Sequence, residues 1–212
     1  MRKNTLYRLA AMALAMLLLL ASAGCSDASS SSSEPEVEEP LYPITINGAE
    51  IRVGETTVQA LLDAGMDITF SEMDSNHQIT QYTVDPSEML EPMSYYSGAS
   101  IWITDHTFAH VAFVTDEEAI PLGEAVIAYI EISFSSNEED NAKSIVSFNG
   151  VMAKDLTREK AGEMFPDFKG DDNMWFSPAS MRNYKYGVYF SSGNLHSLSA
   201  ERRYDVDWSS GS

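Results

Sequence analysis

YPITINGAEIRVGETTVQALLDAG, residues 42–65, is the stretch that decides the expected fold. Branched apolar residues alternate with polar ones on either side of Asn47-Gly48, the dipeptide that tight β-hairpin turns prefer. A threonine at position 56 or 57 can cap a helix, and Gly65 stands where a glycine commonly ends one. The apolar residues between them fall at i, i+3 and i+4: Val58, Leu61 and Leu62. The stretch therefore predicts a strand, a turn, a second strand and a short helix.

The same order of elements returns at residues 144–168, SIVSFNGVMAKDLTREKAGEMFPDF. A short apolar run leads to a second Asn-Gly dipeptide, and Thr157 can cap a second helix. The apolar face of that helix consists of Ala161, Met164 and Phe165. Each stretch is followed by segments rich in β-branched and aromatic residues, which favour strands. We therefore predict an α+β fold of two related units, each a short helix packed on an antiparallel sheet, at residues 43–138 and 139–212.

Residues 1–24 have the pattern of a bacterial export signal. Three basic residues precede an apolar run at residues 9–20, which is too short for a stable membrane span. The sequence ASAGC at 21–25 resembles the junction at which lipoproteins are cut and acylated on cysteine, except that Ser22 stands where leucine is usual. The same residues fit an A-x-A site for ordinary secretion, with cleavage before Gly24. Both alternatives stay open at this point.

Cys25 is the single cysteine of the chain, so it has no disulfide partner within the chain. It stands at the cleavage point and precedes a tract of serine, glutamate and proline that buries too little apolar surface to order itself. We therefore predict an acylated Cys25 followed by a disordered tether over residues 25–42. The folded part would then lie outside the cytoplasm, anchored to the bacterial cell membrane by an N-terminal lipid.

The charge of the chain is distributed unevenly. Residues 1–24 carry three of the 13 basic residues and none of the 32 acidic ones, which leaves 10 − 32 = −22 for the rest. All of this net charge falls on residues 25–142. Nucleic acid is therefore excluded as an expected partner, because its phosphates would be repelled. A cation or a basic face of a protein stays open as a partner, although an acidic surface more often serves only solubility.

No motif in the chain predicts catalysis, a metal or a cofactor. His106 and His110 have the spacing of a helical metal pair, but they lie in a β-forming stretch, where that spacing separates side chains by about 13 Å. The chain has no G-x-S-x-G elbow for a serine nucleophile. The acidic loops at 138–140 and 171–173 lack the ligand order of a calcium loop. We expect no enzyme, no metal site and no cofactor.

Aromatic residues are the candidate contact residues. In YKYGVYF, residues 184–190, alternate tyrosines share one side of the expected strand. Such a side either packs a core under the helix or offers rigid aromatic anchors to a partner. The candidate partner-binding residues are Trp102, Trp175, Tyr184 and Tyr186.

The segment LTREKAGEMFP, residues 156–166, followed by aromatic strands and a final hairpin, resembles the repeat unit of small bacterial lipoproteins of outer-membrane assembly and of the β-lactamase-inhibitor proteins. In that family a threonine caps a helix with apolar residues at fixed positions, which Thr157, Ala161, Met164 and Phe165 match. The family's glycine two residues before the threonine is Asp155 here. The whole layout also resembles surface lipoproteins of Gram-positive bacteria. The resemblance implies protein binding or scaffolding and supplies no catalytic residues.

These observations together predict a non-catalytic lipoprotein that binds a protein partner at the cell envelope. The acidic first half keeps a second hypothesis open, a sensor or carrier domain for a small ligand or a cation. An enzyme acting on cell-wall sugar or peptide is the third hypothesis, and no motif supports it.

Overall fold

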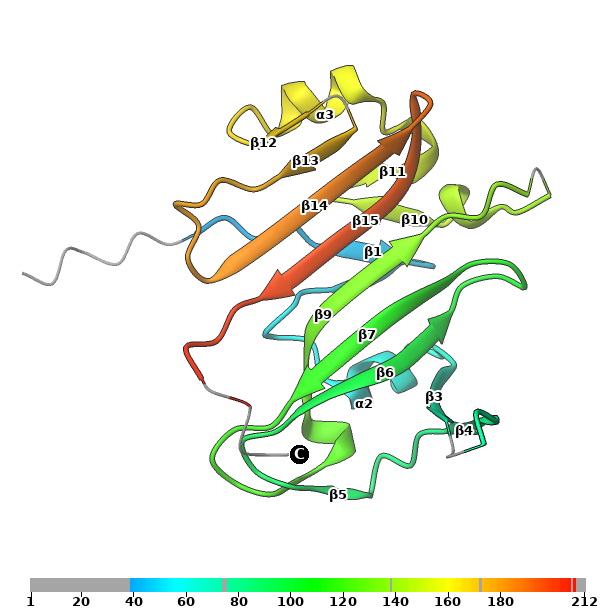
Figure 1. Cartoon of the computed structure of the whole chain (residues 1–212), viewed down its shortest axis with the longest axis vertical. Coiled ribbons are helices and arrows are strands. Elements are labelled where there is room, and N and C mark those ends of the chain that lie inside the picture. The colour runs from blue at the N-terminus through cyan, green and yellow to red at the C-terminus, as the bar shows by residue number, and fades with distance from the viewer. Residues whose placement is uncertain (1–38, 74–75, 138, 172, 207, 209–212) are drawn as a thin grey trace, which may run out of the picture. The chain divides into compact units, whose positions relative to one another are not determined.

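A nine-stranded antiparallel sheet forms the largest part of the computed structural model (Figure 1), which describes residues 39–73, 76–137, 139–171, 173–206 and 208. In spatial order its strands are β12 (Lys169–Gly170), β13 (Met174–Phe176), β14 (Tyr184–Ser191), β15 (Asn194–Arg202), β9 (Val126–Ser133), β7 (Phe108–Val114), β6 (Tyr95–Trp102), β3 (Ile68–Met73) and β4 (Ile79–Thr83). A separate two-stranded ribbon pairs β5 (Met89–Leu90) with β8 (Ile120–Pro121).

The two Asn-Gly hairpins pair with each other in a second sheet. Its strands, in spatial order, are β11 (Val151–Met152), β10 (Val146–Phe148), β1 (Ile44–Ile46) and β2 (Ala49–Ile51). β1 and β10 are antiparallel, with Thr45 opposite Ser147. Both residues of each Asn-Gly turn have positive φ, which is the turn geometry whose twist matches that of the flanking strands. The sequence-based prediction of two hairpins is confirmed, and the hairpins form one sheet together.

Two short α-helices follow these hairpins. α2 covers Val58–Asp63 and α3 covers Arg158–Met164, and the chain adds three 3-10 turns at η1 (Leu122–Glu124), η2 (Ala142–Ser144) and η3 (Ala153–Asp155). The hydroxyl oxygens of Thr57 and Thr157 each accept a hydrogen bond from a backbone N–H of the first turn, at 3.2 Å. Both threonine caps are therefore confirmed. The hydroxyl oxygen of Thr56 instead accepts a hydrogen bond from the N–H of Arg52 at 2.9 Å.

The core lies between the nine-stranded sheet and a layer made of the four-stranded sheet and the helices. Figure 1 draws strands of the four-stranded sheet behind β14, β15 and β9. An aromatic cluster joins the two layers. The rings of Tyr42 and Tyr186 are 5.0 Å apart, and those of Phe148 and Phe165 are 5.2 Å apart. Such aromatic pairs contribute about 0.5–1.5 kcal/mol each beyond the burial of their area. They fix β14 against β10 and the end of α3.

The predicted fold class is wrong. Among the described residues 43% are in strands and 14% are helical, and the sheet of nine strands runs through both expected units. β9 from residues 43–138 pairs with β15 from residues 139–212, so the molecule is not built of two units that each pack a helix on a sheet. The physical reason is length. A helix of six or seven residues is about 10 Å long and covers little of a sheet, so the hairpins provide most of the second layer.

The predicted export signal, the acylation site at Cys25 and the tether up to residue 38 lie outside the described residues. Within the part that is described, no helix is long and apolar enough to cross a membrane.

The last residues of the expected tether are bound to the fold. The carboxylate of Glu39 accepts hydrogen bonds from the backbone N–H groups of Arg182, Asn183 and Tyr184, at 2.6–3.2 Å. The N–H of Tyr42 donates to the hydroxyl of Tyr186 at 3.2 Å. The chain therefore enters the fold at the beginning of β14, three residues before the expected end of the tether.

Candidate functional site

One face of the nine-stranded sheet lies away from the second layer and is the candidate functional surface. In β14, Tyr186 and Val188 point into the core and are each 1% exposed. Because side chains alternate along a strand, Lys185 and Tyr189 point the other way. We call this side of the sheet the open face. No described helix or strand covers it, and the segment after β15 contacts it where Trp208 lies 6.1 Å from Tyr95.

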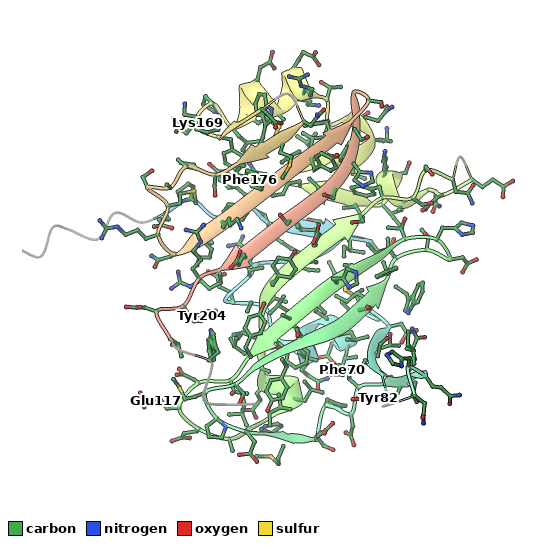
Figure 2. All side chains as sticks on the ribbon, viewed as in Figure 1. Phe70, Tyr82, Glu117, Lys169, Phe176 and Tyr204 are labelled. Carbon is green, nitrogen blue, oxygen red and sulfur yellow. The ribbon has the colours of Figure 1, made fainter. Side chains whose placement is uncertain are left out.

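A row of paired residues crosses the open face from β13 to β4. Strand register places its members opposite one another in the order Phe176, Gly187, Ser199, Glu131, His110, Ser100, Thr69 and Thr83. Small and polar side chains make up the middle of this row. The ring of Phe176, labelled in Figure 2, lies over Gly187, where a Cβ would stand 3.3 Å from a ring carbon. We call this row the polar centre of the open face.

Aromatic and apolar side chains flank this polar centre. Met174 pairs with Tyr189 beside Phe176, and Met174 is 41% exposed. On the other flank, the rings of Trp102 and Phe108 are 5.3 Å apart, and Trp102 is 39% exposed. Two aromatic flanks thus border a polar centre that contains Glu131 and His110 as well as glycine, serine and threonine.

The charged groups near the centre of the open face are mostly paired. Lys185 lies 3.7 Å from Glu201, and its ammonium is 5.9 Å from the ring centre of Phe176. The hydroxyl of Tyr129 donates to Glu131 at 2.6 Å. Burial, followed by this hydrogen bond, raises the pKa of the Tyr129 phenol far above its ordinary value, so it remains a donor at neutral pH. The face thus offers hydroxyl groups and aromatic rings more than free charge.

The structure places three of the four predicted contact residues on the covered side of the sheet. Trp175 pairs with buried Val188 and packs against Gly162 of α3. Tyr186 is 1% exposed, and burial raises its pKa to about 12. The stacked rings of Tyr184 and Tyr186 have their centres 6.2 Å apart, and the guanidinium carbon of Arg202 lies 4.8 Å from the centre of the Tyr184 ring.

Of the four, Trp102 alone is on the open face. The sequence grouped the tyrosines of β14 on one side correctly, but that side faces the core. Tyr186 therefore has no surface to offer a partner in this fold.

Sequence reasoning missed the residues that do line the open face: Phe108, Tyr129, Met174, Phe176 and Tyr189. A signal for β14 was present in Lys185. A lysine is rarely buried without a charged partner, so the residues that share its side of the strand are those directed to solvent. This rule assigns Tyr189 to the open face, and Phe176 follows from its pairing with Gly187.

The histidines weighed as metal ligands are separated in the structure. His106 lies in the bend between β6 and β7, and His110 lies within β7 and is exposed on the open face. Among the residues whose placement is described, no group of three histidine, cysteine or acidic side chains is arranged to hold a metal ion.

Comparison with known proteins finds no match to a family model, to a curated protein or to a solved structure. The likeness of residues 156–166 to lipoprotein repeat units therefore rests on those residues alone.

Proposed function

We propose that this chain is a membrane-anchored lipoprotein outside the cytoplasm that binds a protein partner through the open face and catalyses no reaction. One observation carries the proposal: a large sheet bears two aromatic flanks on a side that no described helix or strand covers. Large apolar side chains that are exposed together mark interaction surfaces, whereas single exposed apolar side chains are common on any protein.

The size of the open face supports a protein as the partner. Nine strands at a spacing of about 4.8 Å span about 38 Å, and a strand of eight residues is about 26 Å long. Because β12 and β13 are much shorter than this, the area of the open face is about 900 Å². A stable interface buries about 800 Å² on each partner, so the open face is wide enough for one.

The chemistry of the open face also fits a protein. Interface centres are rich in aromatic residues and methionine and poor in free charge. The aromatic residues and methionine are Trp102, Tyr189 and Met174, and two of the charged side chains, Lys185 and Glu201, are paired with each other. Hydroxyl groups of the polar centre supply hydrogen-bonding groups without the cost of removing a charge from water.

Cross-linking and pull-down from intact cells test this proposal, with the full chain compared with Cys25→Ala. We expect a discrete protein partner with the wild-type chain and loss of that partner when the anchor is removed. Two further variants separate the surface from the anchor. Trp102→Ala should weaken recovery, whereas Met89→Ala, which removes a side chain that is 60% exposed in β5, should leave it unchanged. Equal recovery with Trp102→Ala and with Met89→Ala would reject the open face as the contact surface.

A further inference from the structure

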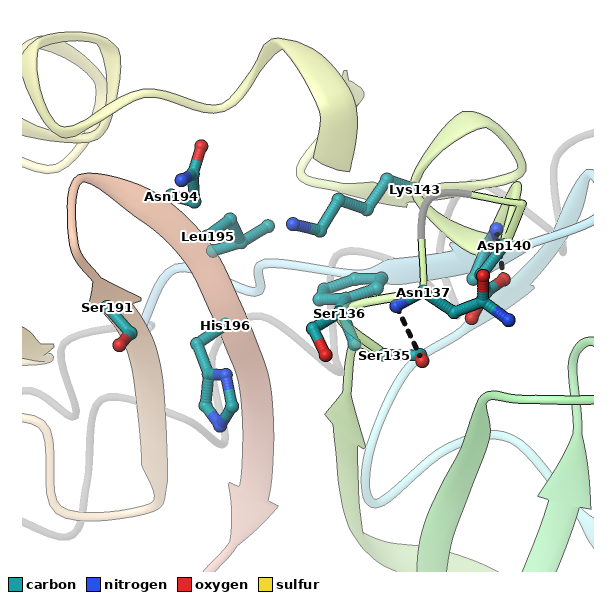
Figure 3. Close-up of a pocket in the computed structure, with 11 residues that line it drawn as sticks. Ser135, Ser136, Asn137, Asp140, Lys143, Ser191, Asn194, Leu195 and His196 are labelled. Carbon is teal, nitrogen blue, oxygen red and sulfur yellow. Dashed lines mark hydrogen bonds between the residues drawn. The ribbon is translucent and has the colours of Figure 1, made fainter.

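A cavity of about 410 Å³ lies at the beginning of β15, apart from the polar centre of the open face. One wall is the loop that follows β9, with Ser136 and Asn137, and the other is the β14–β15 turn, with Ser191 and Asn194 (Figure 3). The side chains of Phe134 and Leu195 close the cavity inside the fold. Its volume is within the range of natural small-molecule sites.

Hydrogen bonds hold the loop wall in place. Asp140 accepts hydrogen bonds from the hydroxyls of Thr104 and Thr107 and from the N–H of Ala142, the first of these at 2.9 Å. This carboxylate ties the loop after β9 to the bend between β6 and β7. Its oxygens are occupied by these donors, so Asp140 acts as a support for the cavity.

The turn wall is equally well defined. Ser192 and Gly193 both have positive φ, which is the geometry of a tight hairpin turn, and the turn joins the two long strands β14 and β15. His196, next to the turn, is held by an edge-on contact with Tyr189 at 5.1 Å. A ligand would therefore meet a cavity that is already formed.

Lys143 brings a positive charge into this cavity. Its side chain extends from the loop side toward Leu195 (Figure 3), and its ammonium lies 5.6 Å from the ring centre of Phe134. Among the described residues no carboxylate lies within ion-pair distance of it. Burial lowers the pKa of Lys143, and Asp140 partly opposes that effect. A partly desolvated ammonium without a paired carboxylate gains more from an anion than a solvated surface lysine does.

Four further side chains of the cavity are hydrogen-bonding groups that have no protein partner among the described residues. Within the described part of the chain, the side chains of Ser136, Ser191, Asn194 and His196 form no hydrogen bond with another residue. Together they can bind several hydroxyl groups. The inner surface formed by Phe134 and Leu195 fits the carbon skeleton that carries those hydroxyls.

We propose that this cavity binds a small hydroxylated monocarboxylate, of the class of sugar acids and hydroxy acids, with its carboxylate on the ammonium of Lys143. Lys143 is the one lysine or arginine among the residues that line the cavity, and Asp140 already offsets part of its charge, so a ligand with a single negative charge suits the cavity better than one with two. A phosphate dianion would leave a negative charge uncompensated in a chain whose residues after position 24 already carry −22 (10 − 32). Phosphate sites also commonly use the fork of an arginine, and no arginine lines this cavity. The proposal is independent of protein binding at the open face.

Calorimetric titration of the full chain with D-glucuronate, D-glucose and inorganic phosphate tests the proposal. Glucuronate should bind, and glucose, which has the same ring without the carboxylate, should bind at least about tenfold more weakly. Phosphate should also be weaker than glucuronate. Lys143→Met should lower the affinity for glucuronate by about tenfold. Lys160→Met, which removes one exposed positive charge on α3, should leave this affinity unchanged.

Melting curves check that each variant is folded, and Asn194→Ala provides a second cavity variant that leaves Lys143 in place. The proposal is wrong if glucose binds as tightly as glucuronate, if phosphate binds more tightly, or if both cavity variants keep the wild-type affinity. Absence of binding to glucuronate and also to lactate would reject the ligand class.

Discussion

The indole of Trp175 lies against Gly162 of α3, and a Cβ added to this glycine would stand 2.8 Å from the ring carbon Cη2. The contact explains why Trp175 is a structural residue: it fastens β13 to the helix. It also explains a glycine inside a helix, where glycine costs about 1 kcal/mol relative to alanine.

Gly162→Ala should therefore destabilise the protein although alanine favours helix. Overpacking costs about 1–3 kcal/mol, which exceeds the gain in helix propensity, so we expect a net loss of about 1 kcal/mol in the free energy of unfolding. Urea unfolding measures this loss. Combining Gly162→Ala with Trp175→Phe should recover part of it because the smaller ring makes room. Glu163→Ala, on the exposed side of α3, is the control, and a more stable Gly162→Ala would contradict the argument.

Tyr186→Phe and Trp102→Ala should separate stability from binding. Tyr186→Phe removes the hydroxyl that accepts the Tyr42 N–H, so unfolding should become easier by about 1 kcal/mol while partner recovery is kept. Trp102→Ala should leave the melting temperature nearly unchanged and reduce recovery. Melting curves and pull-down on the same preparations give both readouts. If Tyr186→Phe reduced partner recovery and Trp102→Ala left it unchanged, the contact surface would be the side of β14 that bears Tyr184 and Tyr186.

Asp140 predicts a specific dependence of stability on pH. Burial raises its pKa, but the hydrogen bonds from Thr107, Ala142 and Thr104 together outweigh burial and hold the pKa below the ordinary value. A carboxyl whose pKa is lower in the folded state stabilises the fold above its unfolded pKa of about 3.9 and loses this contribution as pH falls through the folded pKa.

Asp140→Asn should therefore lower the free energy of unfolding by about 1–2 kcal/mol at neutral pH. The difference from wild type should shrink as pH falls below about 4, where the native carboxyl takes up its proton. Urea unfolding at neutral and acidic pH measures this difference. Asp105→Asn, in the neighbouring bend, serves as the control, and a difference that grows with acidity would contradict the prediction.

The helix caps offer a matched pair. Thr57→Ala and Thr157→Ala each remove one capping hydrogen bond of the same length, so each should cost about 1 kcal/mol. The two sites lie on different helices, so the double variant should lose about the sum of the two. Thermal unfolding of all three variants checks this. A cost at only one cap would show that the other helix is held by packing alone.

Local chemistry explains which features were predictable from the sequence. Asn47-Gly48, the second Asn-Gly dipeptide and the two threonine caps each act within a few residues, and each appears where expected. The pairing of β9 with β15 joins residues far apart in the chain, and no local pattern encodes it. The fold class was therefore wrong where it depended on long-range pairing. The side of the sheet on which the candidate contact residues lie was unpredictable for the same reason, since alternation groups Tyr184 with Tyr186 but does not say which side of a sheet is covered.

Glu39 provides a further test at the entrance of the chain. Glu39→Ala leaves the backbone N–H groups of Arg182, Asn183 and Tyr184 without their acceptor, so we expect a loss of about 1–2 kcal/mol. Hydrogen exchange should quicken at these three amides, and Glu118→Ala on an exposed loop is the control. Unchanged exchange at residues 182–184 would show that the carboxylate does not hold them in solution.

The hydrogen bonds between Glu39 and the beginning of β14 also set the length of the linker between lipid and fold in the anchored protein that we propose. From Cys25 to Glu39 there are 39 − 25 = 14 residues, which reach at most about 50 Å when fully stretched. A force that pulls on the lipid would act first on the hydrogen bonds that three backbone amides, at the edge of the aromatic cluster, donate to Glu39. Breaking them would release three more residues, up to Tyr42, and lengthen the reach by about 10 Å. The hydrogen bonds of the Glu39 carboxylate would thus be the first contacts of the fold to break when the anchor is pulled.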